Sequence, residues 1–168
     1  MLTKLKETIK KLESSKIFKG YKKTNPDAYL TSTFLMTEDL EGDWQLDYYS
    51  IKSKKITSFV IKDKVKSTLE TKPFQEKESI IEKLDIDKVK IGSKKVLEIT
   101  DKLIKKKYKN ETLTKKIIIL QNLKEFGHIW NLTFLTSSFK TLNIKIDATS
   151  GKILKENLAS LITFTKNN

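Results

Sequence analysis

Two stretches of the chain have similar sequences, and this internal similarity constrains the fold more than any other feature. The first stretch, GDWQLDYYSIKSKKITSFVIKD, ends at Asp63, and the second, HIWNLTFLTSSFKTLNIKID, ends at Asp147. Trp44 and Trp130 occupy the same place near the start of each stretch. Self-similarity of this kind indicates a repeated structural unit, in which residues present in both copies serve packing. We therefore expect a duplicated scaffold, which by itself carries no chemistry.

A segment with helical periodicity precedes each stretch. Apolar residues recur at spacings of three and four in residues 2–12, continuing to Tyr21, and again in residues 96–108, as on one face of an amphipathic helix. The first helix should end before Pro26, because proline disfavours helical backbone at the residue that precedes it. Ser93 is a suitable N-cap for the second helix. We therefore predict one helix at the start of each half.

Segments rich in β-branched and aromatic residues follow each predicted helix. In the first half these strands are expected at residues 29–37, 44–50 and 56–62, with 65–70 as a further candidate. In the second half they are expected at residues 116–121, 130–136 and 139–147. The continuous apolar run at residues 117–120 suits a central strand that is covered on both faces.

These elements predict an α+β fold made of two repeats. Each repeat is a helix followed by a three- or four-stranded antiparallel meander, and the helices pack on one face of the sheet. The expected division of the chain is a first repeat at residues 1–72, a connector at 73–92, a second repeat at 93–164 and a tail at 165–168. The apolar residues of the connector indicate that it packs against the rest of the protein; they are Ile80, Ile81, Leu84 and Ile86. Whether the two repeats share one sheet stays open.

The composition limits which partners and which kinds of site are possible. A net charge of +13 attracts anionic partners such as nucleic acid, acidic proteins or lipid headgroups. All 34 basic residues are lysine, so the chain lacks the planar guanidinium that reads guanine edges and binds phosphates in a bidentate way. The alternative is a biased composition whose lysines only solvate the surface. The absence of cysteine excludes disulfides, thiol catalysis and cysteine-based metal sites.

Nothing in the sequence predicts a membrane segment or a signal for export. No apolar run approaches the roughly 20 residues that cross a bilayer. The first residues, MLTKLKETIKKLESS, alternate charged with apolar side chains and lack the apolar core of a signal peptide. We therefore expect a cytoplasmic protein.

The end of the chain carries a family resemblance. The segment FKTLNIKIDATSGKILKENLASL resembles the closing hairpin of PepSY-type domains, in which a strand, an aspartate, a short turn and Gly-Lys precede the last strand. The matching residues here are Asp147, Gly151, Lys152 and Ile153. The segment IGSKKVLEITDKLIKKKY is similar to the opening helix of these domains, whereas the first half has Asp63 without the glycine.

The resemblance covers about residues 92–161 and implies tandem PepSY-like repeats. Such tandem units are also similar in architecture to the β-lactamase inhibitor protein, whose concave sheet grips another protein. The resemblance therefore implies a non-enzymatic binding or inhibitory module.

The alternation of the strands suggests candidate partner-binding residues. Trp44, Leu46 and Tyr48 lie on one face of their strand, and the second half repeats this pattern from Trp130. If helices cover that face, the opposite face is free to hold a protein or an extended ligand. The candidate partner-binding residues on it are Gln45, Asp47, Tyr49, Asn131 and Thr133. The alternative is that these residues belong to an ordinary solvated sheet.

Other conspicuous residues have structural explanations. Asp147 and Gly151 are typical of a tight hairpin turn. The repeated position of Trp44 and Trp130 favours a core role over a role as recognition anchors. His128 is the only histidine and has no cysteine or acidic ligand at metal-binding spacing. No phosphate-binding loop or nucleophile motif occurs, so we expect no enzyme, no cofactor and no metal.

Two readings of the function stay open. The first is a small binding or regulatory protein that holds an unknown partner protein or peptide on its sheet face. The alternative is a lysine-driven binder of nucleic acid or an anionic surface, without sequence preference and sensitive to salt. An exposed edge strand would also permit a homodimer by sheet extension.

Overall fold

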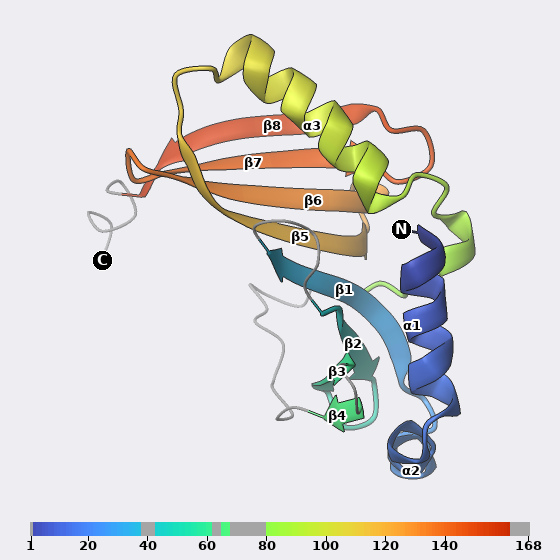
Figure 1. Ribbon diagram of the computed structural model, residues 1–168. Helices are drawn as coiled ribbons and strands as arrows, with labels where there is room; N and C mark the ends of the chain where they lie inside the picture. The colour runs from blue at the N-terminus through green and yellow to red at the C-terminus, as the bar shows by residue number, and fades with distance from the viewer. Residues whose placement is uncertain (1, 38–42, 62–64, 68–79, 162–168) are drawn as a thin grey trace.

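One eight-stranded antiparallel sheet forms the centre of the protein, with the strand order β4-β3-β2-β1-β5-β6-β7-β8 (Figure 1). This computed structural model describes residues 2–37, 43–61, 65–67 and 80–161, and the fold is given for these residues. Figure 1 shows α3 lying across the strands of the second half, while α1 and α2 lie beside those of the first half.

The described elements comprise three α-helices, one 3₁₀ turn and the eight strands of the sheet. The helices are α1 (Leu2–Ser14), α2 (Lys16–Thr24) and α3 (Ser93–Lys107), with a 3₁₀ turn at Ile86–Lys88. The strands of the first half are β1 (Tyr29–Thr37), β2 (Gln45–Ser50), β3 (Lys55–Ile61) and β4 (Val65–Ser67). The strands of the second half are β5 (Leu113–Leu123), β6 (Gly127–Thr136), β7 (Lys140–Asp147) and β8 (Ile153–Ser160). No helix among these residues combines the length and the apolar character needed to span a membrane.

This topology corrects the predicted fold class. We expected two α+β repeats, each with one helix and its own meander, and that expectation is wrong. The chain forms one sheet-rich structure in which β1 hydrogen-bonds to β5, from the pair Ser32–Gln121 to the pair Thr37–Lys116. The physical reason is that β1 and β5 would each be an exposed edge strand in a separate unit, and their pairing removes both edges.

The start of the chain also differs from the single helix that its apolar periodicity predicts. The helix is interrupted at Ser15, whose hydroxyl accepts a hydrogen bond from the backbone N–H of Phe18 at 3.2 Å. Serine is a strong N-cap because its side chain satisfies an N–H that the first turn of a helix leaves free. Two helices, α1 and α2, therefore precede β1.

The core lies between the helices and one face of the sheet. Trp44 and Trp130 are buried, with only 5% and 1% of their surfaces exposed, so the predicted core role is confirmed. Their ring centroids are 6.2 Å apart, and the Trp130 indole N–H donates to the backbone oxygen of Ile91 at 2.8 Å. The helices contribute the following fully or largely buried side chains: Leu5, Ile9, Leu12, Phe18, Val96, Leu97 and Leu103.

The segment before α3 packs against the sheet, as its apolar residues predict. The backbone N–H of Leu84 donates to the oxygen of Leu30 at 2.8 Å, and the Leu84 side chain is buried. The Tyr29 hydroxyl donates to the oxygen of Ile81 at 2.6 Å, whereas the Ile80 side chain is exposed. Other features named from the sequence lie outside the described residues; these are connector residues 73–79, Asp63 and the tail at 165–168.

The turn between β7 and β8 has the structure expected from Asp147 and Gly151. The Asp147 carboxylate accepts hydrogen bonds from the backbone N–H groups of Ser150 at 2.6 Å and Thr149 at 3.0 Å. These bonds, that of Ser150 first, hold the pKa of Asp147 below its usual value. Gly151 has a φ of +78°, which residues with a Cβ rarely adopt. The turn interpretation of both residues is confirmed.

Candidate functional site

The face of the sheet opposite the tryptophans carries all five predicted site residues, and we call it the open face. Directly paired residues of antiparallel strands point to the same side, so the register gives rows of neighbours across this face. One such row, the central row, runs through its middle. From β3 to β8 it consists of Val60, Gln45, Phe34, Ile119, Asn131, Lys145 and Lys155. The predicted residues Gln45 and Asn131 are thus three strands apart, about 14 Å at the usual strand spacing.

Gln45 and Asp47 belong to a closed hydrogen-bond network in the first half. The Asp47 carboxylate accepts bonds from the Ser32 hydroxyl at 2.9 Å, the Gln45 amide at 2.8 Å and the Ser58 hydroxyl at 2.6 Å. A carboxylate with three internal donors is largely satisfied without a ligand. These side chains therefore hold β1, β2 and β3 together.

Tyr49 stands apart from this network. Its ring lies edge-on to that of Tyr29, with centroids 5.8 Å apart, near the end of the sheet where Tyr29 bonds to Ile81. Tyr49 therefore packs against Tyr29 and lies outside the hydrogen-bond network of Asp47.

Asn131 and Thr133 meet in a second polar network, centred on Asn143. The Asn143 amide N–H₂ donates to Asn131 Oδ1 at 2.8 Å and to Thr133 Oγ1 at 3.0 Å. Asn143 Oδ1 in turn accepts a bond from the Lys145 ammonium at 2.8 Å. We call Asn131, Thr133, Asn143 and Lys145 the asparagine cluster. Sequence reasoning missed Asn143 and Lys145, although their alternation along β7 already places both on one face.

Lys145 is a base of the open face whose pKa is lowered by its surroundings. Burial lowers its pKa, and the neighbouring charge of Lys155 lowers it further, while Glu125 acts in the opposite direction. Its ammonium also lies 5.9 Å from the centre of the Phe126 ring. In the part of the chain that the structure describes, neither Lys145 nor Lys155 forms a salt bridge. Two cations therefore lie side by side, and the Glu125 carboxylate acts on Lys145 from beyond salt-bridge distance.

An apolar stripe separates the two polar networks. It consists of Phe34, Ile117 and Ile119 on the adjacent strands β1 and β5, and all three side chains are partly exposed. None of the three helices lies on this face, because their buried residues pack with the tryptophan side. The open face thus has an apolar middle with an ordered polar network on each side.

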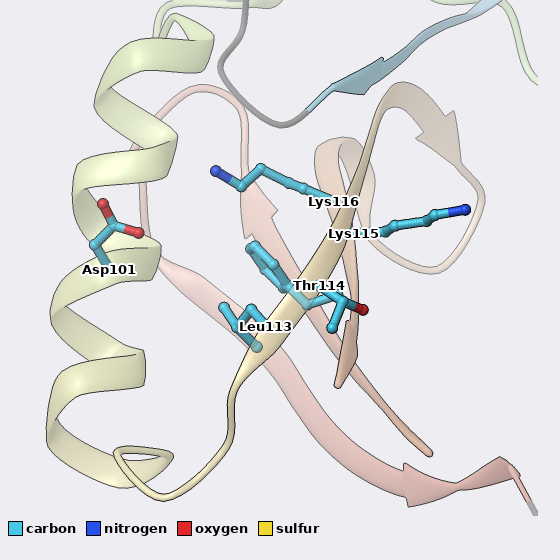
Figure 2. Close-up of a pocket in the computed structure, with 6 residues that line it drawn as sticks. Asp101, Leu113, Thr114, Lys115 and Lys116 are labelled. Atoms are coloured by element: carbon cyan, nitrogen blue, oxygen red, sulfur yellow. The ribbon is translucent and has the colours of Figure 1, made fainter. Parts of the chain in front are cut away.

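A cavity of about 330 Å³ lies on the opposite face, between α3 and the start of β5 (Figure 2). It is lined by Asp101, Leu113, Thr114, Lys115, Lys116 and Phe134. Figure 2 shows Lys116 extending from β5 toward α3, whereas Lys115 extends to the other side of the strand. None of the predicted site residues lines this cavity. Within the described ranges, no group of three potential metal ligands occurs.

His128 has a structural role that uses its basic nitrogen. Its Nε2 accepts a hydrogen bond from the backbone N–H of Asp85 at 3.0 Å, which ties the segment before α3 to β6. Burial, followed by the nearby charge of Lys88, lowers the pKa of His128 below its usual 6.5. The imidazole is therefore neutral at pH 7, with its proton on Nδ1.

We predict that protonation of His128 destabilises the protein. Because its pKa is lower in the folded state, the unfolded chain binds more protons below pH 6.5, so stability is complete above that pH and decreases as the pH falls. The Tm should fall between pH 7 and pH 5, and His128→Gln should flatten this dependence because glutamine accepts the same bond without titrating. The pKa of the Asp147 carboxyl lies below its ordinary 3.8, so this group does not titrate between pH 7 and pH 5. An unchanged pH profile in His128→Gln would refute the assignment.

Comparisons with known proteins reveal the fold but no activity. No protein-family model matches the chain, and no curated protein matches it. The resemblance to PepSY-type domains therefore stays a prediction. Among solved structures, the chain is similar to the crystal structure of a "putative lipoprotein" from Clostridium difficile, with a TM-score of 0.54 and 15% sequence identity. The match covers 84% of this chain and 90% of the other, and at this identity it speaks for a shared fold alone.

Proposed function

We propose that this protein is a binding protein that holds a partner protein or peptide on the open face of its sheet. The observation that carries the proposal is the apolar stripe of Phe34, Ile117 and Ile119, which the helices leave partly exposed. Apolar surface with a polar rim is typical of sites where proteins interact. The stripe supplies the apolar contact, and the asparagine cluster supplies ordered polar groups beside it.

The two polar networks have different parts in this proposal. The network around Asp47 is internally satisfied and fixes the strands of the first half. The asparagine cluster retains donors, because the Lys145 ammonium has three N–H groups and uses one of them on Asn143. Asn131 and Thr133 therefore stay candidates for partner contact, whereas Gln45 and Asp47 support the surface from within.

Capture of a partner by the intact protein and by a variant of the stripe tests this function. The double substitution Ile117→Gln and Ile119→Gln makes the stripe polar without changing side-chain length much. We expect the intact protein to retain a stoichiometric partner from nuclease-treated native lysate, and the variant to lose about tenfold or more in affinity, equivalent to roughly 1.4 kcal/mol.

The matched control changes two exposed isoleucines that are not part of the apolar stripe, Ile17→Gln and Ile80→Gln, whose side chains are 46% and 71% exposed. This control should retain the partner, and thermal unfolding should show that both variants are folded. Equal retention by the stripe variant, or recovery of nucleic acid alone before nuclease treatment, would contradict the proposal.

A further inference from the structure

Lys145 and Lys155 occupy directly opposite positions on β7 and β8, at one end of the central row. Like charges at such positions repel each other, which destabilises a sheet. Elsewhere the same two strands pair their charges: Lys140 of β7 lies 2.7 Å from Glu111, and Glu156 of β8 lies 2.6 Å from Lys107. The unbalanced pair is therefore a local feature of the open face.

Lys145 is held in place before any ligand arrives. Its ammonium donates to Asn143 Oδ1 at 2.8 Å and lies over the Phe126 ring. Asn143 is fixed in turn by Asn131 and Thr133. A positioned and partly buried ammonium loses less conformational freedom on binding an anion than a mobile surface lysine does. The asparagine cluster thus presents Lys145 as a preorganised donor.

The rest of the central row does not continue this positive charge. Next to Lys145 come the neutral Asn131 and then Ile119 and Phe34 of the apolar stripe. Beyond the stripe lies the network of the Asp47 carboxylate. A uniformly charged nucleic-acid backbone would meet cations at one end and a carboxylate at the other. A protein segment with one acidic and one apolar part matches this distribution better.

We infer that Lys145 and Lys155 bind the side-chain carboxylate of an extended acidic segment of the partner, whose apolar residue lies on the stripe of Phe34, Ile117 and Ile119. This inference rests on the proposed function and names the chemistry of its partner. The two lysines lie two and three strands from Ile119, about 10 to 14 Å. An extended chain rises about 3.4 Å per residue, so the acidic residue falls about three or four positions from the apolar one.

Two synthetic peptides test the inference on the full-length protein. One peptide carries a leucine and, about three and four positions later, two glutamates. The other has glutamines in place of the glutamates. NMR titration of the labelled protein should give about tenfold tighter binding of the glutamate peptide, with shifts at Lys145 and Lys155, since charge-assisted contacts are worth at least this factor. Equal binding of the two peptides up to millimolar concentrations would overturn the inference.

Matched charge variants separate a local site from general attraction. Lys145→Gln with Lys155→Gln should abolish the preference for glutamate. Lys10→Gln with Lys102→Gln removes the same charge from exposed positions of α1 and α3 and should preserve it. An equal loss in both variants, or tighter binding of an oligothymidylate of the same charge, would mean that the lysines act only as a diffuse cation field.

The peptide experiment and the partner-capture experiment can fail independently of each other. If Ile117→Gln with Ile119→Gln loses the native partner while glutamate and glutamine peptides bind alike, the open face binds a partner and the acidic assignment fails. If that variant keeps its partner, the proposal that the open face binds a partner is itself contradicted.

A further measurement uses the free protein, where Lys155→Gln should raise the Tm by about 1–3 °C because it removes the repulsion with Lys145. A lower Tm in Lys155→Gln than in the intact protein would contradict the repulsion between Lys145 and Lys155.

Discussion

Replacement of Trp130 by alanine should lower the free energy of unfolding by about 3–5 kcal/mol, the range for large aromatic side chains in a core. Trp130 is 1% exposed and its ring lies 6.2 Å from that of Trp44. Its indole N–H also donates to Ile91 at 2.8 Å, which joins β6 to the chain segment that leads into α3. The substitution removes packing and this bond together.

Urea denaturation followed by circular dichroism measures the loss. Trp130→Phe separates its two parts, because phenylalanine keeps an aromatic ring and lacks the N–H; the bond alone should contribute about 0.5–1.5 kcal/mol. Ile51→Ala is the control for a large apolar side chain in solvent, since Ile51 is 60% exposed, and its effect should be close to zero. A loss below about 1 kcal/mol in Trp130→Ala would contradict the packing described for the centre of the core.

Replacement of Phe59 by alanine should have a similar effect, again about 3–5 kcal/mol. Phe59 on β3 is fully buried, and three aromatic rings surround it. The centroids of Tyr21, Phe18 and Tyr48 lie 5.2, 5.5 and 5.9 Å from its own. These contacts attach α2 to the first half of the sheet, so the substitution weakens that attachment.

The same experiment tests the continuity of the sheet. Because β1 pairs with β5, we expect Phe59→Ala and Trp130→Ala to shift one common unfolding transition, although the two residues lie in different halves. Tryptophan fluorescence and circular dichroism should report the same midpoint in each variant. Two separate transitions, with each substitution moving only one, would show instead that the halves unfold independently.

Much of the local structure follows from the sequence because it depends on neighbouring residues. The strands expected at 29–37, 44–50 and 56–62 are found at Tyr29–Thr37, Gln45–Ser50 and Lys55–Ile61. Alternation along β2 also assigns Trp44 and Gln45 to opposite sides, since a strand repeats every two residues. The turn at Asp147 and Gly151 is likewise local, because the carboxylate bonds to the backbone two and three residues later.

The candidate site was predicted less completely, since a functional surface depends on which strands are neighbours. Gln45 and Asn131 are equivalent by sequence, but the register places the stripe of Phe34 and Ile119 between them. Lys145 and Lys155 lie on different strands and become neighbours only through the pairing of β7 with β8. Asp47 was expected to face a partner and instead accepts three internal hydrogen bonds.

The sequence by itself therefore determined where β1, β2, β3, β5, β6 and β7 lie, the turn of the last hairpin and the side of the sheet to which each residue of β2 and β6 points. Only the tertiary structure decided that β1 pairs with β5 and that the two halves are one sheet. It also decided that Lys145 and Lys155 share the end of the open face, where neither forms a salt bridge with any residue that the structure describes. The physical reason is that side-chain alternation and turn chemistry act over a few residues, whereas strand order depends on which edges meet and are removed from solvent.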